Sequence, residues 1–330
     1  MKFRTIAAAV LALSAGTLAA GATTATAEPL RVAYWSSGFS LGFGAVLEQE
    51  KFLEKEGVEA TYRKFSEVAA PAQAVLNGDV DVAFAAPAAA AFNLGQQGAP
   101  IRVILATQIL EGRIVVPTDS PIKTPKDLAG KKVGMSRPGS STHAVATTLL
   151  KTLYDVQPND YAVVPGNEGQ LAQLLARGDI DAAALRNVTI AQIAKGTVRP
   201  IADIVPDWKK MTKGDAPPIL AVALTRAEVV EKRPEDLAAL VRAMRAATAW
   251  GSANPEGVAE HLVKAANMDA DAARNYAELW DVIYTSSLAP EDVAALKAEN
   301  QIFVDSGATK GMAPDSLYAT GPFEKATAGK

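Results

Sequence analysis

The sequence has 330 residues, 49% of them hydrophobic and 21% charged, which is the composition of a globular protein with room for two domains. Lys and Arg total 33 and Asp and Glu total 36, a formal charge of −3, so nucleic acid is not an expected partner. The sequence contains no cysteine, which excludes disulfides, thiolate metal sites, iron–sulfur clusters and a cysteine nucleophile.

The first 27 residues have the pattern of a secretory signal peptide. Residues 1–4 carry two positive charges, residues 6–13 are apolar, and Ala25-Thr26-Ala27 supplies the small residues of a cleavage site. The apolar run is too short to span a bilayer. We therefore predict a mature chain that starts near Glu28, is exported to the periplasm and carries no lipid anchor.

Strands and helices alternate along the mature chain. The first set comprises strands at 30–35, 58–65, 80–85 and 101–107 and helices at 45–56, 68–77 and 87–97. The pattern restarts after residue 119, with a helical turn at 125–128, strands at 131–135, 161–164 and 181–185, and helices at 141–154, 168–177 and 190–195. Strands separated by helices of this length predict parallel βαβ units with both faces of the sheet covered.

One ten-residue pattern occurs twice, at 74–83 and 174–183. In each copy an apolar-faced helix ends at a glycine, Gly78 or Gly178, and an Asp-x-Asp turn opens a short apolar strand. The repeat predicts two similar α/β lobes. The last third of the chain differs, because after a strand at 219–225 it reads as helices at 234–251, 255–266, 269–284 and 290–305.

The predicted fold class is α/β, with two lobes that each hold a mainly parallel sheet flanked by helices, and a helical C-terminal region. We expect lobe 1 to be discontinuous, formed by residues 28–112 and 216–330, and lobe 2 to comprise residues 113–215. In open α/β sheets the ligand lies outside the carboxyl ends of the strands. Two such sheets facing each other would enclose a small molecule, with the linking strands as hinges.

Catalytic motifs are few. The two histidines, His143 and His261, lie far apart in the sequence, and no Gly-x-Ser-x-Gly turn or phosphate-binding loop is present. Gly42-Phe43-Gly44 follows a strand, but Leu47 stands where the dinucleotide fingerprint needs its third glycine. We predict a protein that is not an enzyme and that uses no cofactor or metal.

Hydroxyl side chains precede the helix predicted at 141–154. Ser140, Ser141 and Thr142 follow a glycine there, and free N–H groups at a helix start suit an anion. A plain capping sequence is the alternative interpretation. Arg137, just upstream, either adds a cation to this site or is solvated.

Two further groups of residues are predicted to bind ligand. Trp35, Ser36, Ser37 and Phe39 follow the first strand, where aromatic side chains could form a wall; we favour Trp35 over Tyr34, which suits the core equally well. Around the predicted connection to lobe 2 lie three polar residues, Gln108, Glu111 and Arg113. A ligand role for these three and an exposed connection are equally compatible with the sequence.

Several stretches together carry a resemblance to a known family. These are residues 30–37, 50–58, 78–84, 120–133, 139–142 and 178–182, of which 127–133 (Asp-Leu-Ala-Gly-Lys-Lys-Val) is the most specific. The chain resembles the taurine/aliphatic-sulfonate/nitrate-type (NMT1/THI5-like) solute-binding proteins of ABC importers. The resemblance implies a type II periplasmic binding fold and a monomer that delivers a solute to an ABC permease in the inner membrane.

The chain departs from that family at two strand ends. Ala85-Ala86-Pro87 stands where sulfonate binders usually have a Thr/Ser-Gly turn, so Ala86 presents an apolar wall instead of a hydroxyl. Arg186-Asn187-Val188 replaces the common Trp-Asp-Pro, and Asn187 cannot pair with an ammonium group. Arg186 could hold a carboxylate or sulfonate in a bidentate fork, or it could form a surface salt bridge.

The predicted ligand is therefore a small organic anion, a sulfonate or carboxylate with an apolar or aromatic body. Trp35 and Phe39 would contact the body, while Arg186 and the amides of residues 140–142 would contact the charge. Three alternatives stay open. They are a neutral heteroaromatic ligand such as a thiamine-pyrimidine precursor, a sensory solute-binding protein, and a pyrimidine-synthase-like enzyme, against which the absence of cysteine argues.

Overall fold

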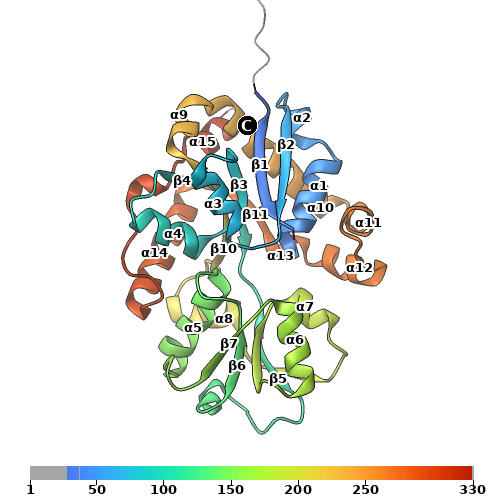
Figure 1. Cartoon of the computed structure of the whole chain (residues 1–330), viewed down its shortest axis with the longest axis vertical. Helices are drawn as coiled ribbons and strands as arrows, with labels where there is room; N and C mark the ends of the chain where they lie inside the picture. The colour runs from blue at the N-terminus through green and yellow to red at the C-terminus, as the bar shows by residue number, and fades with distance from the viewer. Residues whose placement is uncertain (1–27, 37, 329–330) are drawn as a thin grey trace, which may run out of the picture.

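The computed structural model describes residues 28–36 and 38–328 (Figure 1). The predicted signal peptide at 1–27 and the predicted ligand residue Ser37 lie outside these ranges. Two sheets, each flanked by helices, lie one above the other in Figure 1 and form two lobes. In the described part of the chain, no helix has the length and apolar character that crossing a membrane requires.

The upper lobe contains a six-stranded sheet of order β11-β4-β10-β3-β1-β2. Its strands are β1 (Leu30–Trp35), β2 (Ala60–Phe65), β3 (Val82–Pro87), β4 (Ile101–Ile109), β10 (Ile219–Arg226) and β11 (Tyr284–Ser287). β2, β1 and β3 are parallel, whereas β10 is antiparallel to both β3 and β4. The sheet is therefore mixed, with the predicted parallel unit at one side.

Helices cover both faces of this sheet, and the C-terminal helices complete the lobe (Figure 1). They are α1 (Gly38–Gln49), α2 (Phe52–Lys55), α3 (Ala70–Asn77), α4 (Ala88–Gln96), α9 (Ala227–Lys232), α10 (Pro234–Ala253), α11 (Pro255–Ala266), α12 (Ala270–Glu278), α13 (Trp280–Ile283), α14 (Pro290–Ser306), a 3-10 turn at Asp315–Leu317 and α15 (Gly321–Thr327).

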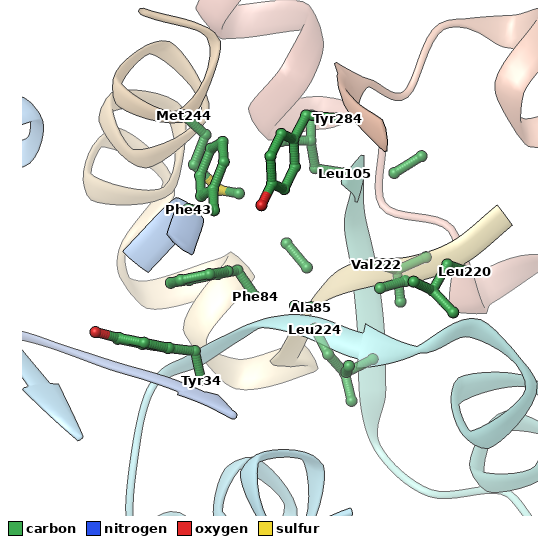
Figure 2. Packing of buried hydrophobic residues seen from close by; sticks show 14 of the residues in the cluster. Tyr34, Phe43, Phe84, Ala85, Leu105, Leu220, Val222, Leu224, Met244 and Tyr284 are labelled. Atoms are coloured by element: carbon green, nitrogen blue, oxygen red, sulfur yellow. The ribbon is translucent and has the colours of Figure 1, made fainter. Parts of the chain in front are cut away.

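Aromatic side chains form the centre of the upper core. Figure 2 shows Phe84 between Tyr34 and Phe43, with Met244 beside Phe43. The ring centroids of Tyr34 and Phe84 are 4.9 Å apart in a stacked pair, and those of Phe43 and Tyr284 are 5.0 Å apart. These pairs join β1, β3, α1 and β11, so the core fixes the start of α1 against the sheet.

The lower lobe contains a five-stranded sheet of order β7-β6-β8-β5-β9. Its elements are β5 (Arg113–Pro117), a 3-10 turn at Pro125–Leu128, β6 (Lys132–Met135), α5 (Ser141–Tyr154), β7 (Ala162–Pro165), α6 (Glu168–Arg177), β8 (Ala182–Leu185), α7 (Asn187–Gln192), β9 (Val198–Asp203) and α8 (Ile204–Thr212). β7, β6 and β8 are parallel, and β5 is antiparallel to β8 and β9.

The two lobes repeat one plan, as the ten-residue pattern predicted. In the upper lobe the Asp81 carboxylate accepts a hydrogen bond from Arg31 N at 3.0 Å, and in the lower lobe Asp181 accepts one from Lys132 N at 2.8 Å. Each Asp thus joins the start of one parallel strand to the start of the next. The strand orders β2-β1-β3-β10-β4 and β7-β6-β8-β5-β9 match position by position.

In each lobe, the first strand that the chain enters after leaving the other lobe runs antiparallel to its neighbours, and this strand is β5 or β10. β5 follows β4 through residues 110–112, and β10 follows α8 through residues 213–218. We call these two connecting segments, 110–112 and 213–218, the crossovers. They are hydrogen-bonded to each other, because Leu110 N donates to Pro218 O at 2.8 Å. The first crossover is also bonded to the start of α8, where Ile204 N donates to Gly112 O at 2.9 Å. The predicted lobe boundaries at 112/113 and 215/216 fall within these crossovers and stay a prediction.

Several predicted elements need correction. β5, β9, β11, α8, α9 and α15 were not predicted, and α1 begins at Gly38 instead of residue 45. The single helix predicted at 269–284 is wrong, because that stretch forms α12, α13 and the first residue of β11. The helix predicted at 190–195 instead occupies Asn187–Gln192. The α/β fold class is confirmed, with antiparallel pairs added.

Apolar packing connects the lobes on one side. Figure 1 shows α4 and α14 above α5 and α8, and Trp208 of α8 packs edge-on against Phe303 of α14, their ring centroids 6.2 Å apart. Val145 and Leu149 of α5 belong to the same buried cluster. This part of the core is shared by both lobes.

Gly42 is where a C-terminal side chain lies against α1. A Cβ at Gly42 would stand 2.1 Å from the Tyr276 hydroxyl oxygen. Alanine favours a helix interior by about 1 kcal/mol over glycine, but overpacking costs about 1–3 kcal/mol or more. We therefore expect Gly42→Ala to lower the free energy of unfolding by at least about 1 kcal/mol, as measured by urea denaturation.

The matched control is Gly169→Ala, in the first turn of α6. A Cβ there meets no atom closer than Asn167 Oδ1, at 3.8 Å. Gly169→Ala should leave stability unchanged or raise it by up to about 1 kcal/mol. Equal effects of the two substitutions would contradict the close approach of Tyr276 to Gly42.

Glu299 of α14 is a buried carboxyl at the second crossover. It is 2% exposed, and one oxygen accepts a hydrogen bond from Ile219 N at 2.8 Å. Burial raises the pKa of Glu299 from 4.5 to about 8. The folded state therefore holds this proton more tightly than the unfolded chain does, and stability falls as the pH rises from about 4.5 to about 8.

We expect Glu299→Gln to remove that loss, because the amide retains an oxygen for Ile219 N and carries no charge. The variant should be more stable than wild type at about pH 8, by on the order of a few kcal/mol, with a smaller difference at about pH 5. Thermal unfolding at both pH values measures this. A gain in stability that does not change with pH would contradict the raised pKa.

Candidate ligand-binding site

Helix starts from the two lobes meet at the lobe interface. α1 and α4 follow β1 and β3 in the upper lobe, and α5 and α7 follow β6 and β8 in the lower lobe, so each begins at the carboxyl end of a parallel strand (Figure 1). Two contacts join them across the interface. The Arg186 guanidinium carbon lies 3.9 Å from the centre of the Phe39 ring, and Ala89 N donates to Ser141 Oγ at 3.1 Å.

Arg186 is buried at this interface. Its exposed fraction is 7%, and its Nε lies 3.3 Å from Glu111 Oε1. Its Nη2 is buried and has no hydrogen-bond partner. The surface salt bridge considered from the sequence is therefore wrong, whereas the ligand role of Arg186 stays a prediction. A buried guanidinium N–H without a hydrogen-bond partner lowers the stability of the fold. A ligand oxygen that accepted a hydrogen bond from Nη2 would remove that cost.

Glu111 ties Arg186 to the first crossover. Its second carboxylate oxygen accepts a hydrogen bond from Asn187 N at 2.9 Å, so one side chain contacts both of the first two residues after β8. The adjacent Gly112 has φ 129°, and a Cβ there would lie 2.5 Å from Leu185 O. Glycine is needed because the crossover passes directly against the end of β8.

A second carboxylate lies on the other side of the same turn. Glu168, the first residue of α6, accepts hydrogen bonds from Arg186 N at 3.1 Å and from Thr189 Oγ1 at 2.6 Å. Burial raises the pKa of Glu168, and the positive charge of Arg186 partly offsets this effect. Asn187 Oδ1 is buried without a partner. Two carboxylates therefore bond to this turn, Glu111 through the guanidinium and the backbone and Glu168 through the backbone and Thr189.

Two tyrosines from the C-terminal region hold the start of α1. Tyr276 and Tyr284 both donate to the Phe39 carbonyl oxygen, at 2.9 Å and 2.5 Å. Burial raises the pKa of both hydroxyls, so they remain protonated donors. The ring of Phe39 packs edge-on against Tyr276 with centroids 5.1 Å apart. Phe39 is thereby fixed where Arg186 covers its ring.

The α4–α5 contact lies beside an unusual backbone conformation. Ala85 has φ 62°, a left-handed conformation that costs a non-glycine residue about 1 kcal/mol or more, and β3 is irregular there. Ala86 is buried, as are Ser141 and Thr142. Ser140 is the N-cap of α5, since its Oγ accepts from His143 N at 3.2 Å, so the capping interpretation is confirmed for this residue.

Among the described residues, no hydrogen bond or ion pair joins Arg186 to Trp35, Ser36, Gln108, Arg113 or Arg137. Trp35 is half-buried and donates through Nε1 to Ser66 O at 3.1 Å, while Ser36 Oγ donates to Phe65 O at 2.9 Å. Gln108 is buried on β4, and Arg137 is exposed. Arg113 pairs with Asp203, its Nε 3.0 Å from the carboxylate. Tyr34 belongs to the core, and a ligand role for the other residues stays a prediction.

Sequence reasoning missed most of the residues that orient Arg186 and Phe39. Glu111 was named at the expected crossover, but its pairing with Arg186 was not predicted, and an exposed connection was equally compatible with the sequence. Glu168 begins a helix after Asn167, a common position for acids. Tyr276 and Tyr284 fell within one predicted helix, which gave no reason for both to reach α1.

The fold is that of two-lobed type II periplasmic binding proteins. The alkanesulfonate-binding protein SsuA from Xanthomonas axonopodis pv. citri, solved bound to MOPS, aligns with TM-score 0.73 and 16% identity over 88% of this chain and 98% of its own. The NMT1/THI5-like family profile matches residues 44–258. The chain belongs to the NMT1/THI5-like family.

Two relatives by sequence are binding proteins. The taurine-binding periplasmic protein of Escherichia coli (strain K12) is 27% identical over 206 residues, which span 62% of this chain and 61% of that protein. A binding protein of Brucella abortus (strain 2308) is 25% identical over 274 residues, 82% of this chain and 80% of its own length. Both relatives are named as binding proteins, in agreement with the prediction, whereas the desulfurization enzyme DSZB shares the fold with TM-score 0.63 and 15% identity.

Within residues 28–36 and 38–328, no group of three or more His, Asp or Glu side chains is arranged to hold a metal ion. At the lobe interface the structure brings together the Arg186 guanidinium, the carboxylates of Glu111 and Glu168, and the ring of Phe39. These groups can bind and orient a small molecule.

Proposed function

We propose that this protein is the periplasmic solute-binding component of an ABC importer and that it captures a small organic sulfonate or carboxylate between its lobes. The observation that carries the proposal is Arg186, whose guanidinium is buried at the lobe interface with Nη2 lacking a partner. An anionic oxygen at Nη2 would satisfy a donor whose burial unpaired costs about 1–3 kcal/mol.

The start of α5 supplies a second set of donors for the anion. α4 and α5 are nine and fourteen residues long, and their first turns contact each other through Ala89 N and Ser141 Oγ. Free N–H groups at helix starts favour negative charge. The names of the relatives support the same class, since one binds taurine and another binds alkanesulfonates.

The apolar part of the ligand would contact Phe39, Ala86 and Trp35. Phe39 is buried at the start of α1, Ala86 is buried near the end of β3, and Trp35 ends β1. Ala86 offers no hydroxyl, which favours an apolar or aromatic body over a small polar one. Gln108, Arg113, Arg137 and Asn187 remain proposed contributors at the edge of this site.

The proposed location of the protein is the periplasm, and its proposed partner is an inner-membrane permease. A signal peptide at residues 1–27 would export the chain, and membership in the NMT1/THI5-like family supports delivery to an inner-membrane permease. The lobes would be residues 28–112 with 216–330, and residues 113–215, closing around the solute in a monomer. Two crossovers that are hydrogen-bonded to each other suit a hinge.

One contact favours a second ligand class. The guanidinium of Arg186 lies over the Phe39 ring, and Glu111 already neutralises its charge. A flat neutral heteroaromatic such as a pyrimidine could stack between them once the lobes open. Such a ligand would need no anionic group.

We expect Arg186→Ala to weaken binding of the anionic ligand by at least about tenfold, because a hydrogen bond to a charged group is worth about 1.5–3 kcal/mol. Isothermal titration against alkanesulfonates, aromatic carboxylates and pyrimidines measures this. Arg186→Lys keeps a charge for Glu111 but loses the planar fork, so it should fold normally and still bind the anion weakly.

The control is Arg177→Ala, which removes an exposed guanidinium paired only with Asp179 in the described structure. Its anion affinity should match wild type. Unchanged anion affinity in Arg186→Ala would remove Arg186 from the site, and binding of pyrimidines alone would favour the second ligand class. Recovery of a chemically altered molecule by mass spectrometry would contradict a binding protein.

A further inference from the structure

We infer that Glu111 determines ligand specificity by neutralising Arg186, so that the site accepts singly charged or neutral ligands and rejects dianions. The inference rests on the proposed function, because it assumes that the ligand reaches Arg186. It adds the charge state of the ligand, which family membership and the fold leave undefined.

Glu111 is buried and held in place beside Arg186. It is 4% exposed and lies in the crossover between the lobes. One carboxylate oxygen faces Arg186 Nε at 3.3 Å, and the other accepts from Asn187 N at 2.9 Å. Both oxygens are engaged, so the carboxylate is held beside the guanidinium and cannot turn away when a ligand arrives.

The carboxylates near Arg186 offset its positive charge. Glu168 also contacts this turn, through Arg186 N and Thr189 Oγ1. In the described part of the chain, Arg186 is the only basic side chain that pairs with either carboxylate. The immediate surroundings of the guanidinium therefore carry no net positive charge, and they are negative whenever Glu168 is ionised.

This lack of net positive charge around Arg186 affects anions of different charge differently. A monoanion at Nη2 gains a charge-assisted hydrogen bond and the partial positive charge of helix starts nearby. A second negative charge on the same ligand group is attracted by Arg186 and repelled by Glu111 at similar range, so it gains no comparable contact, while its removal from water costs more. With an effective dielectric constant of about 20, the repulsion by Glu111 alone is worth more than about tenfold in affinity, and it offsets the attraction that Arg186 would otherwise exert.

Phosphonates and sulfonates with the same organic group provide a sensitive test. Both headgroups are tetrahedral, but at about pH 9 the phosphonate carries two negative charges and the sulfonate one. The probes are ethanesulfonate with ethylphosphonate, and benzenesulfonate with phenylphosphonate. Isothermal titration of the exported protein gives, for each pair, the ratio of the phosphonate Kd to the sulfonate Kd.

In wild type this ratio should exceed about ten for the pair that binds. Glu111→Gln keeps an acceptor for Asn187 N but removes the charge, so the ratio should fall by about tenfold or more. Glu168→Gln, a second variant that removes the other carboxylate, should lower it as well. The matched control is Glu299→Gln, which also replaces a buried carboxyl bonded to a backbone N–H at a crossover, and it should leave the ratio unchanged.

The outcomes separate this inference from the proposed function. If wild type binds a sulfonate and its matched phosphonate equally well, or if Glu111→Gln folds and keeps the wild-type ratio, Glu111 is a structural cap and the inference is wrong. If wild type binds neither these sulfonates nor the aromatic carboxylates titrated above, the proposed anion ligand fails and the inference fails with it. Glu111→Asp, which keeps the charge, should retain the discrimination that Glu111→Gln loses.

Discussion

A buried guanidinium must be paired, and much of the lobe interface is arranged to pair Arg186. Glu111 neutralises it, and Phe39 covers one face of it at 3.9 Å. Each of these partners depends on another part of the chain, because Gly112 brings the crossover against β8 and two C-terminal tyrosines fix Phe39. Removing one partner would leave a buried charge uncompensated, which is far more costly than the pair is stabilising.

The sequence predicts correctly those parts of the fold that depend on residues adjacent to one another in the chain. The helix ends at Gly78 and Gly178 and the Asp-x-Asp turns after them depend on a few adjacent residues, and both copies form the predicted structure. β5 and β11 could not be predicted in this way, because they are short and are defined by pairing with strands distant in the sequence. The helix predicted at 269–284 ends on Tyr284, which pairs with β4 instead.

In the site, too, sequence predicts the residues marked by a local pattern and misses those whose roles depend on distant parts of the chain. Arg186 was predicted because it departs from a family pattern at a strand end, and Ser141 because hydroxyls gather at a helix start. Glu111 and Glu168 are ordinary acids in sequence, and they acquire their roles only where the crossover and α6 meet the end of β8. Trp35 was favoured over Tyr34 because it adjoins a polar loop, and in the structure its indole N–H donates to Ser66 O, just after β2.

The two sides of the lobe interface differ in their physical chemistry. On one side Trp208 and Phe303 belong to an apolar cluster shared by both lobes, and separating them would expose hydrophobic surface. On the other side the lobes meet through Arg186 and Phe39, a contact of modest strength whose polar groups can exchange partners. A motion that opens the lobes therefore costs least when the α5–α14 packing remains intact and Arg186 separates from Phe39. Such a motion would expose the guanidinium and the ring together, while Glu111 stays with Arg186 because both its oxygens are bonded to that turn.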